Sequence, residues 1–159
     1  MALNSGIIFP TSKEANAVRM IGDKYDLKLI LVHGSYAGGT AKRNSDLDIA
    51  ILGRKEVTGG KFLNIYDDFS EAVGNNLDRE LDLTTLHRAD PLFCYQVAKK
   101  SRLLYGATTD YASYKAYAYA YYMDSKDLFE LEKTLVFRFQ KYLNEKYLNT
   151  ETTAMEHAG

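Results

Sequence analysis

The chain has 159 residues, of which 46% are hydrophobic and 26% are charged, and its formal net charge is −1. This length and composition exclude a disordered or fibrous chain and favour one globular domain with a substantial core. The near-neutral charge argues against direct nucleic-acid binding and against an anionic-membrane partner. No signal peptide begins the chain and no window approaches the ~18 apolar residues of a membrane span, so we expect a cytoplasmic protein.

The first half of the chain predicts alternating helices and strands. The predicted elements are a short helix that begins at Pro10-Thr11-Ser12 and ends near Tyr25, a buried strand over 28–33 (KLILVH), one or two helical turns over 35–41, and a strand over 46–52 (DLDIAIL). The helix start carries a capping pattern, and both strands have the length and branched residues of buried strands. Gly34 closes the first strand, so the chain turns abruptly there.

The second half predicts more helix. In chain order it contains a helix over 62–73 stopped by Gly74-Asn75, a strand over 79–86 (RELDLTTL), and a helix from Asp90-Pro91 to about Lys100. From Thr108 to Tyr147 there is neither proline nor glycine, and an apolar face recurs at Leu128, Leu131, Leu135, Phe139 and Leu143. We expect two helices here, or one broken near Asp124-Ser125. The whole pattern predicts an α/β (α+β) fold, a small mixed sheet with flanking helices and a C-terminal helical extension.

Three aspartates occur on predicted strands and are candidate metal ligands. Asp46 and Asp48 are two residues apart on one strand, so both point to the same side, while the apolar residues between them point to the other. Two close carboxylates raise each other's pKa unless a cation lies between them, and hard oxygen ligands of this kind suit Mg²⁺. Asp82, flanked by Leu81 and Leu83, faces away from the core layer and offers a third carboxylate.

The turn at Gly34 and Ser35 is a candidate phosphate site. Glycine lets the backbone approach a ligand, and amides at the start of a helix present donors to an anion. A single Gly-Ser turn is common, and a lone Asp-x-Asp is more often solvated surface than a metal site. The ordered combination, Gly-Ser, ten residues, Asp-x-Asp and a later strand aspartate, is rare by chance and favours a site for a nucleotide with metal.

The stretch HGSYAGGTAKRNSDLDIAIL closely resembles the signature of the DNA polymerase β-like nucleotidyltransferase superfamily. With the later LDLTTL it looks most like the minimal nucleotidyltransferases, or MNT proteins, which act as antitoxins paired with HEPN-domain RNase toxins. The resemblance covers roughly residues 28–106. It implies a nucleotidyltransferase domain over 1–106, a helical extension of the same compact unit over 107–148, and a disordered tail over 149–159.

The resemblance also implies roles for individual residues. Gly34 and Ser35 would hold the β- and γ-phosphates of ATP. Asp46, Asp48 and Asp82 would bind Mg²⁺, two ions in all, and Asp82 would help to activate the attacking hydroxyl.

The loop after the Gly-Ser turn departs from the family pattern at one position. Family members commonly have an arginine where this chain has Gly38, so one basic contact near the site is missing. Lys42 and Arg43 are the candidates to replace it as nucleotide-binding residues.

The function implied is transfer of AMP from ATP to a tyrosine hydroxyl of a cognate HEPN toxin, which silences that RNase. Two alternatives remain open on the sequence. One is the same chemistry on a small molecule such as an aminoglycoside, although about 50 residues leave little room for the larger helical domain of that class. The other is an antitoxin that acts by binding alone, which Gly38 favours and the three aspartates oppose.

Overall fold

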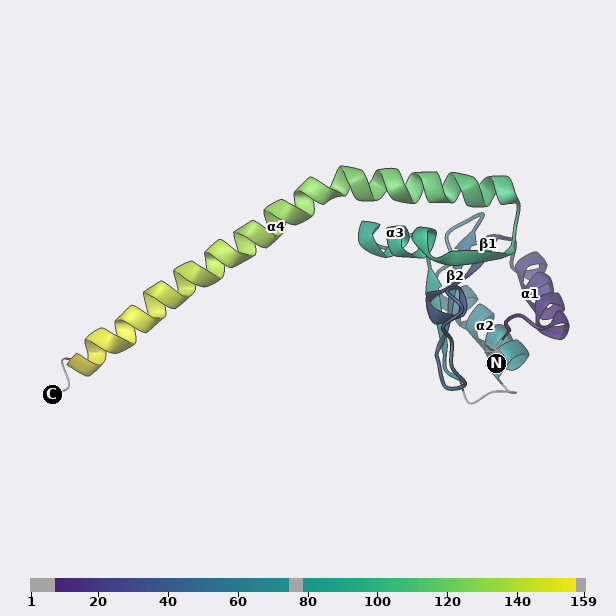
Figure 1. Ribbon diagram of the computed structural model, residues 1–159, viewed down its shortest axis with the longest axis horizontal. Helices are drawn as coiled ribbons and strands as arrows, with labels where there is room; N and C mark the ends of the chain where they lie inside the picture. Colours follow the sequence, from purple (N-terminus) through teal and green to yellow (C-terminus); the bar gives the residue numbers. More distant parts are fainter. Residues whose placement is uncertain (1–7, 75–78, 157–159) are drawn as a thin grey trace, which may run out of the picture. The chain divides into compact units, whose positions relative to one another are not determined.

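A computed structural model describes residues 8–74 and 79–156 of the chain (Figure 1). The elements in order are α1 (Ser12–Lys24), β1 (Leu27–His33), the 3₁₀ turn η1 (Gly34–Tyr36), β2 (Leu47–Gly53), α2 (Gly59–Phe69), the π-helical turn η2 (Ser70–Gly74), β3 (Leu81–Thr85), α3 (Pro91–Lys99), β4 (Ser101–Tyr105) and α4 (Thr108–Glu156).

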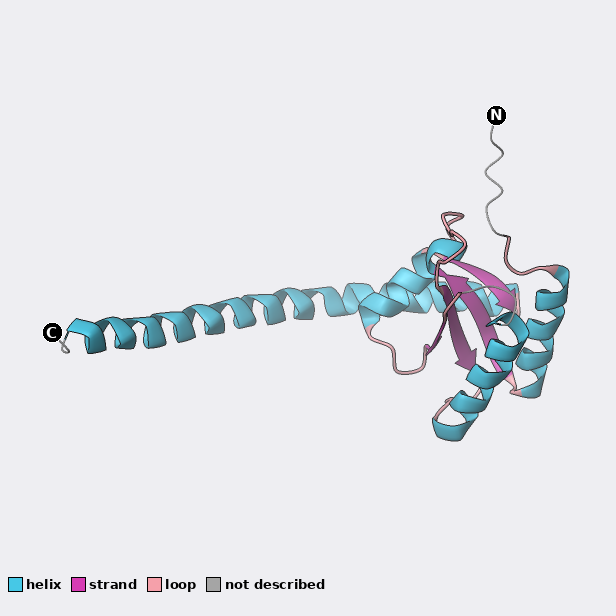
Figure 2. Ribbon diagram, turned by 90° about the horizontal axis from the view of Figure 1, so that it is seen from below, coloured by secondary structure: helices cyan, strands magenta, loops and turns pink. Residues whose placement is uncertain are grey.

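The four strands form one mixed sheet in the order β3-β2-β1-β4. The sheet is drawn in magenta in Figure 2. β1 pairs antiparallel with both β2 and β4, whereas β2 pairs parallel with β3. The parallel pair needs a crossover, and α2 supplies it. The predicted fold class, a small mixed sheet with flanking helices, is confirmed.

Each face of the sheet packs against two helices, because side chains alternate along the strands. One cluster joins the sheet to α1 and α2 and contains Val18, Ile30, Ile49, Ile51, Ile65 and Phe69. The other joins it to α3 and the start of α4 and contains Leu29, Leu31, Ala50, Val97, Tyr114 and Ala118. Two buried faces explain why β1 reads as a nearly continuous apolar run.

Two predicted helix starts are confirmed with their caps. At α1 the Thr11 hydroxyl accepts from the Glu14 amide at 3.3 Å, and the Glu14 carboxylate accepts from the Thr11 amide at 3.2 Å. At α3 the Asp90 carboxylate accepts from the Phe93 amide at 2.9 Å. These pairs satisfy amides that have no partner inside the helix.

Several predicted boundaries were wrong. The helical turns expected over 35–41 are one 3₁₀ turn, and the strand expected from Asp46 begins at Leu47. β4 was not predicted, because its five residues carry no alternation and its strand state depends on pairing with β1. The helix expected over 62–73 begins earlier, at Gly59, and passes into η2; Asn75 of its predicted stop lies outside the described residues.

α4 is one continuous helix, so the break expected near Asp124-Ser125 is absent. The contacts of the chain nevertheless divide close to that point, after Tyr122. The helix is described through Glu156, inside the stretch where we predicted a disordered tail, and residues 157–159 lie outside the described part. The domain limits 1–106 and 107–148 stay predictions.

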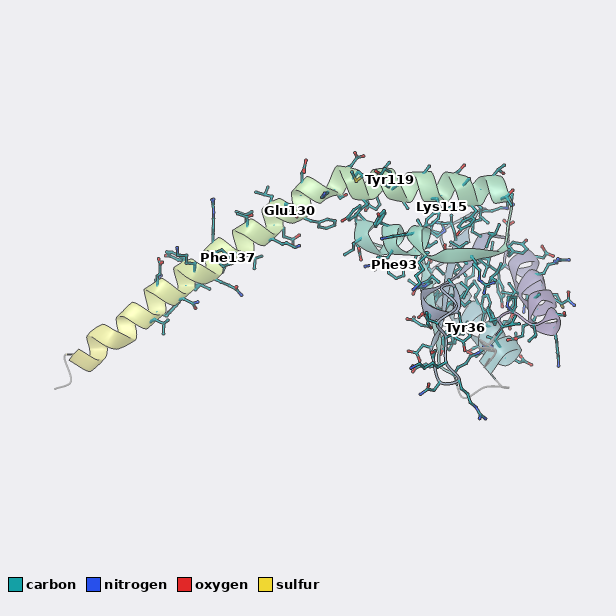
Figure 3. All side chains as sticks on the ribbon, viewed as in Figure 1. Tyr36, Phe93, Lys115, Tyr119, Glu130 and Phe137 are labelled. Carbon is teal, nitrogen blue, oxygen red and sulfur yellow. The ribbon has the colours of Figure 1, made fainter. Side chains whose placement is uncertain are left out.

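The second contact unit begins at Met123 and is the later part of α4. Its large apolar side chains are exposed, as Figure 3 shows for Phe137. Four residues of the predicted apolar face, Leu128, Leu131, Leu135 and Phe139, are among these exposed side chains. In the described part of the chain, no helix combines the length and apolar character needed to cross a membrane.

One buried cation ties the helical layer to the loop after β1. The Arg79 guanidinium donates to the Glu14 carboxylate at 2.6 Å and to the Val73 carbonyl oxygen at 3.2 Å. It also lies 5.0 Å from the ring centre of Phe9 and 5.4 Å from that of Tyr36. The Arg79 and Glu14 side chains are only 2% and 13% exposed, so this ion pair is largely removed from water.

Replacing Arg79 by alanine should destabilise the domain strongly, because it leaves the Glu14 carboxylate buried without its partner. We expect a loss of about 3 kcal/mol in the free energy of unfolding, measured by urea titration. Arg54→Ala is the matched control: that arginine pairs with Asp26 at 3.2 Å with both side chains exposed, so its loss should cost less than about 1 kcal/mol. Equal effects of the two substitutions would contradict the buried-pair account.

Candidate active site

Three neighbouring strands bring His33, Asp48 and Asp82 into one row, which we call the carboxylate row. His33 lies opposite Asp48 across the antiparallel β1–β2 pair, and Asp48 lies opposite Asp82 across the parallel β2–β3 pair. Directly opposed residues project from the same face of a sheet, so all three side chains belong to the α3 side. The prediction that Asp48 and Asp82 point away from Leu47, Leu81 and Leu83 is confirmed, because these leucines lie in the opposite core cluster.

The Gly34 turn lies against the Asp48 carboxylate. Gly34 has φ +68°, which side chains other than glycine's rarely allow. A Cβ atom at this position would collide with Asp48 Oδ2 and would lie 3.2 Å from Asp48 Cγ. Only glycine therefore lets the turn approach the carboxylate row. Just after η1, the Gly38 amide donates a hydrogen bond to the Gly34 carbonyl oxygen at 3.1 Å.

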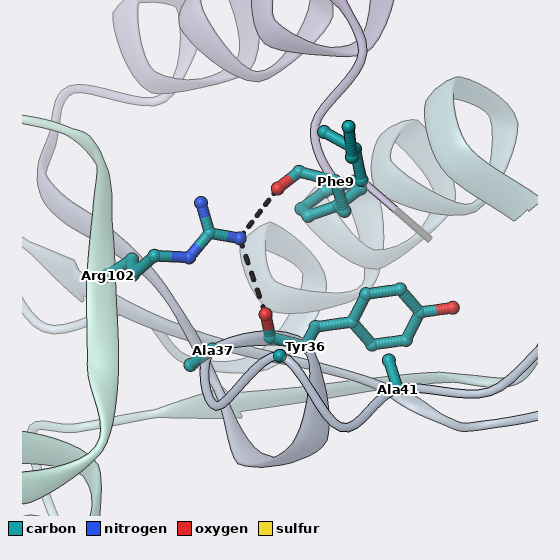
Figure 4. Close-up of a pocket in the computed structure, with 7 residues that line it drawn as sticks. Phe9, Tyr36, Ala37, Ala41 and Arg102 are labelled. Carbon is teal, nitrogen blue, oxygen red and sulfur yellow. Dashed lines mark hydrogen bonds between the residues drawn. The ribbon is translucent and has the colours of Figure 1, made fainter. Parts of the chain in front are cut away.

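The other side of this turn is supported by Arg102 on β4 (Figure 4). Its guanidinium donates to the Phe9 carbonyl oxygen at 2.7 Å and to the Tyr36 carbonyl oxygen at 3.4 Å. A cavity of about 270 Å³ lies here, lined by Ile8, Phe9, Tyr36, Ala37, Gly39, Ala41 and Arg102. Phe9 and Tyr36 belong to the core cluster of α1 and α2, so this cavity is separate from the carboxylate row.

The carboxylate row is electrostatically strained. Partial burial raises the pKa of Asp48, and the neighbouring charges of Asp82 and Asp46 raise it further. Burial lowers the pKa of His33, against an opposing effect of Asp82. The His33 ring packs edge-on against Phe93 at 5.7 Å, and within the described residues its buried Nε2 has no hydrogen-bond partner.

These residues fit a metal ion that has substrate oxygens among its ligands. Over residues 8–74 and 79–156, no three acidic, histidine or cysteine side chains are gathered closely enough to hold a metal alone. Asp46 is exposed and one residue outside β2, which leaves Asp48 and Asp82 as the opposed pair. Mg²⁺ commonly takes one or two carboxylates and completes its shell with water and phosphate oxygens. A cation would relieve the repulsion that raises the Asp48 pKa.

The remaining predicted residues lie on the loop between β1 and β2. Ser35 is the second residue of η1, directly after Gly34, and is half-buried. Lys42 and Arg43 are exposed farther along the loop, where the Lys42 amide donates to the Ser45 hydroxyl at 2.8 Å. Sequence reasoning missed Lys100, whose ammonium lies beside Gly38. No local pattern indicates this contact, because it joins the end of α3 to a loop more than sixty residues earlier.

Comparison with known proteins identifies the class. Residues 16–110 match the family described as Polymerase beta, Nucleotidyltransferase, and the chain belongs to this family. The resemblance inferred from the sequence is thereby confirmed. Among curated proteins it is similar to Protein adenylyltransferase MntA of Shewanella oneidensis, with 32% identity over 99 residues that cover 61% of this chain and 68% of the relative.

Solved structures share the fold. A crystal structure of a toxin–antitoxin with AMP-PNP aligns with TM-score 0.64 and 24% identity, covering 77% of this chain and 98% of that one. A tri-AMPylated Shewanella oneidensis HEPN toxin in complex with MNT antitoxin aligns with TM-score 0.60 and 20% identity, covering 77% and 96%. Each of these alignments leaves nearly a quarter of this chain uncovered.

Replacing Asp48 by asparagine should stabilise the metal-free protein at neutral pH. The folded state raises the pKa of Asp48. At a pH above that raised pKa the ionised carboxylate therefore lowers the free energy of unfolding. The penalty disappears at a pH low enough to protonate the carboxyl in both the folded and the unfolded state. Thermal unfolding in a chelating buffer should show a higher midpoint for Asp48→Asn at pH 7–8. The gain should shrink as the pH falls toward the ordinary aspartate value of 3.8.

Asp67→Asn, on the exposed side of α2, is the control for this comparison. A midpoint for Asp48→Asn at or below that of the unaltered protein at pH 7–8 would show that the carboxylate row is not strained.

Proposed function

We propose that this protein transfers AMP from ATP to a tyrosine hydroxyl of a cognate HEPN-domain RNase toxin in the cytoplasm, and so neutralises that toxin. The carrying observation is the juxtaposition of the Gly34 turn with the Asp48–Asp82 pair in a chain of the nucleotidyltransferase family. Similarity to a protein adenylyltransferase supports protein as the acceptor class, and the fold shared with MNT antitoxins supports a HEPN toxin.

The proposed site divides the work between the turn and the strands. The Gly34 and Ser35 backbone approaches the β- and γ-phosphates, and the Ser35 hydroxyl adds a donor to them. Asp48 and Asp82, with Asp46 at the edge of β2, would hold Mg²⁺, two ions in all, as the divalent cofactor. When bound, Mg²⁺ neutralises phosphate charge and polarises the phosphoryl oxygens.

The proposed reaction is an in-line displacement at the α-phosphorus. The tyrosine oxygen forms a bond to that phosphorus, the bond to the β-phosphate oxygen breaks, and pyrophosphate leaves. Asp82, which is exposed at the outer end of the row, would accept the phenolic proton. Most of the rate enhancement would come from positioning and from fixed charges around the phosphates.

Replacing Asp48 by alanine should lower AMP transfer at least about a hundredfold, because the opposed carboxylate pair is lost. The assay incubates the protein with ATP, Mg²⁺ and the HEPN-domain product of the adjacent gene, and the intact masses of both chains are then measured. Asp46→Ala and Asp82→Ala should also lose transfer. Asp67→Ala, which removes an exposed carboxylate from α2, should retain it.

The same measurement separates the competing functions. A mass gain of one or more AMP groups on the toxin supports the proposal. A stable complex with no mass gain would indicate an antitoxin that acts by binding alone. Transfer to an aminoglycoside and not to the toxin would indicate small-molecule modification.

A further inference from the structure

Lys100 occupies the space that a side chain at position 38 would fill. A Cβ atom on Gly38 would collide with Lys100 Cε and would lie 2.8 Å from Lys100 Nζ. The same point lies 3.7 Å from the Gly34 carbonyl oxygen, so the ammonium group is beside the turn that approaches Asp48. Gly38 is the position at which the family commonly has an arginine.

The backbone fixes where Lys100 starts. Lys100 is the residue that caps the C-terminal end of α3, and its amide donates to the Gln96 carbonyl oxygen at 3.1 Å. The next residue, Ser101, begins β4 and lies opposite His33. The sheet therefore places Lys100 immediately beside the row formed by His33, Asp48 and Asp82.

The Lys100 charge is available to a ligand. The side chain is exposed, and in the part of the chain that the structure describes its ammonium has neither a hydrogen-bond partner nor an ion pair. Lys42 and Arg43, the other candidates, extend from the exposed loop farther along the chain. Lysine binds phosphate as a compact point charge, and a flexible stem lets it follow the ligand.

We propose that Lys100 binds the polyphosphate of the nucleotide at the Gly34 turn, and that Gly38 is small because the Lys100 side chain crosses it. This assignment rests on the proposed function, since it names a residue for the nucleotide of that same site. The basic contact missing from the loop is supplied from the end of α3. An ammonium group here offsets the repulsion between the carboxylate row and the incoming phosphates.

Nucleotide affinity tests the assignment without relying on transfer. Isothermal titration with a non-hydrolysable ATP analogue and Mg²⁺ should give a dissociation constant about tenfold higher for Lys100→Ala than for the unaltered chain. Lys99→Ala, the adjacent exposed lysine of α3, should bind normally. Lys100→Arg should keep most of the affinity, and Gly38→Arg added to Lys100→Ala should recover it, because the arginine then enters the vacated space.

Several results would overturn this assignment. Normal affinity of Lys100→Ala is one, and a loss confined to Lys42→Ala and Arg43→Ala is another. A circular dichroism spectrum and unfolding midpoint like those of the unaltered chain establish that Lys100→Ala is folded. If the unaltered chain binds no nucleotide, both proposals fail; if affinities follow the expected pattern but no AMP reaches the toxin, only the proposed function fails.

Discussion

The parallel register between β2 and β3 is the constraint on which the site depends. It places Asp48 opposite Asp82, and the antiparallel register of β1 places His33 opposite Asp48. A slip of one residue in either pair would turn a side chain of the row into the core cluster of the opposite face. The buried leucines and isoleucines between the polar residues oppose that slip, because it would remove them from the core cluster of α1 and α2. The core and the site therefore specify the same register.

The row is costly to the folded protein, and this cost is informative about function. The pKa of Asp48 lies above its ordinary value because this carboxylate is partly buried and lies near the charges of Asp82 and Asp46. The His33 Nε2 is buried without a hydrogen-bond partner among the described residues. Folding alone gives no reason to gather such groups. Side chains with shifted pKa values or unpaired buried polar atoms, held at the end of a sheet, are typical of sites that are completed by a ligand.

Two arginines hold the Gly34 turn in the place where it meets this row. The Arg79 guanidinium lies over the Tyr36 ring, and the Arg102 guanidinium donates from β4 to the Phe9 and Tyr36 carbonyl oxygens. The loop after β1 is thus fixed from two elements that are distant in sequence. The Lys100 side chain, from the C-terminal end of α3, lies beside Gly38 of the same loop.

The sequence by itself determined the local features: the capped starts of α1 and α3, the buried strands β1 and β2, the turn at Gly34, and the family, through the spacing of Gly-Ser to Asp-x-Asp. These depend on nearby residues, so a pattern can carry them. Only the tertiary structure decided that β4 is a strand, that α4 is unbroken, and that Lys100 crosses Gly38. Strand pairing and side-chain contact between distant segments depend on which elements pack together, and no local spacing encodes that choice.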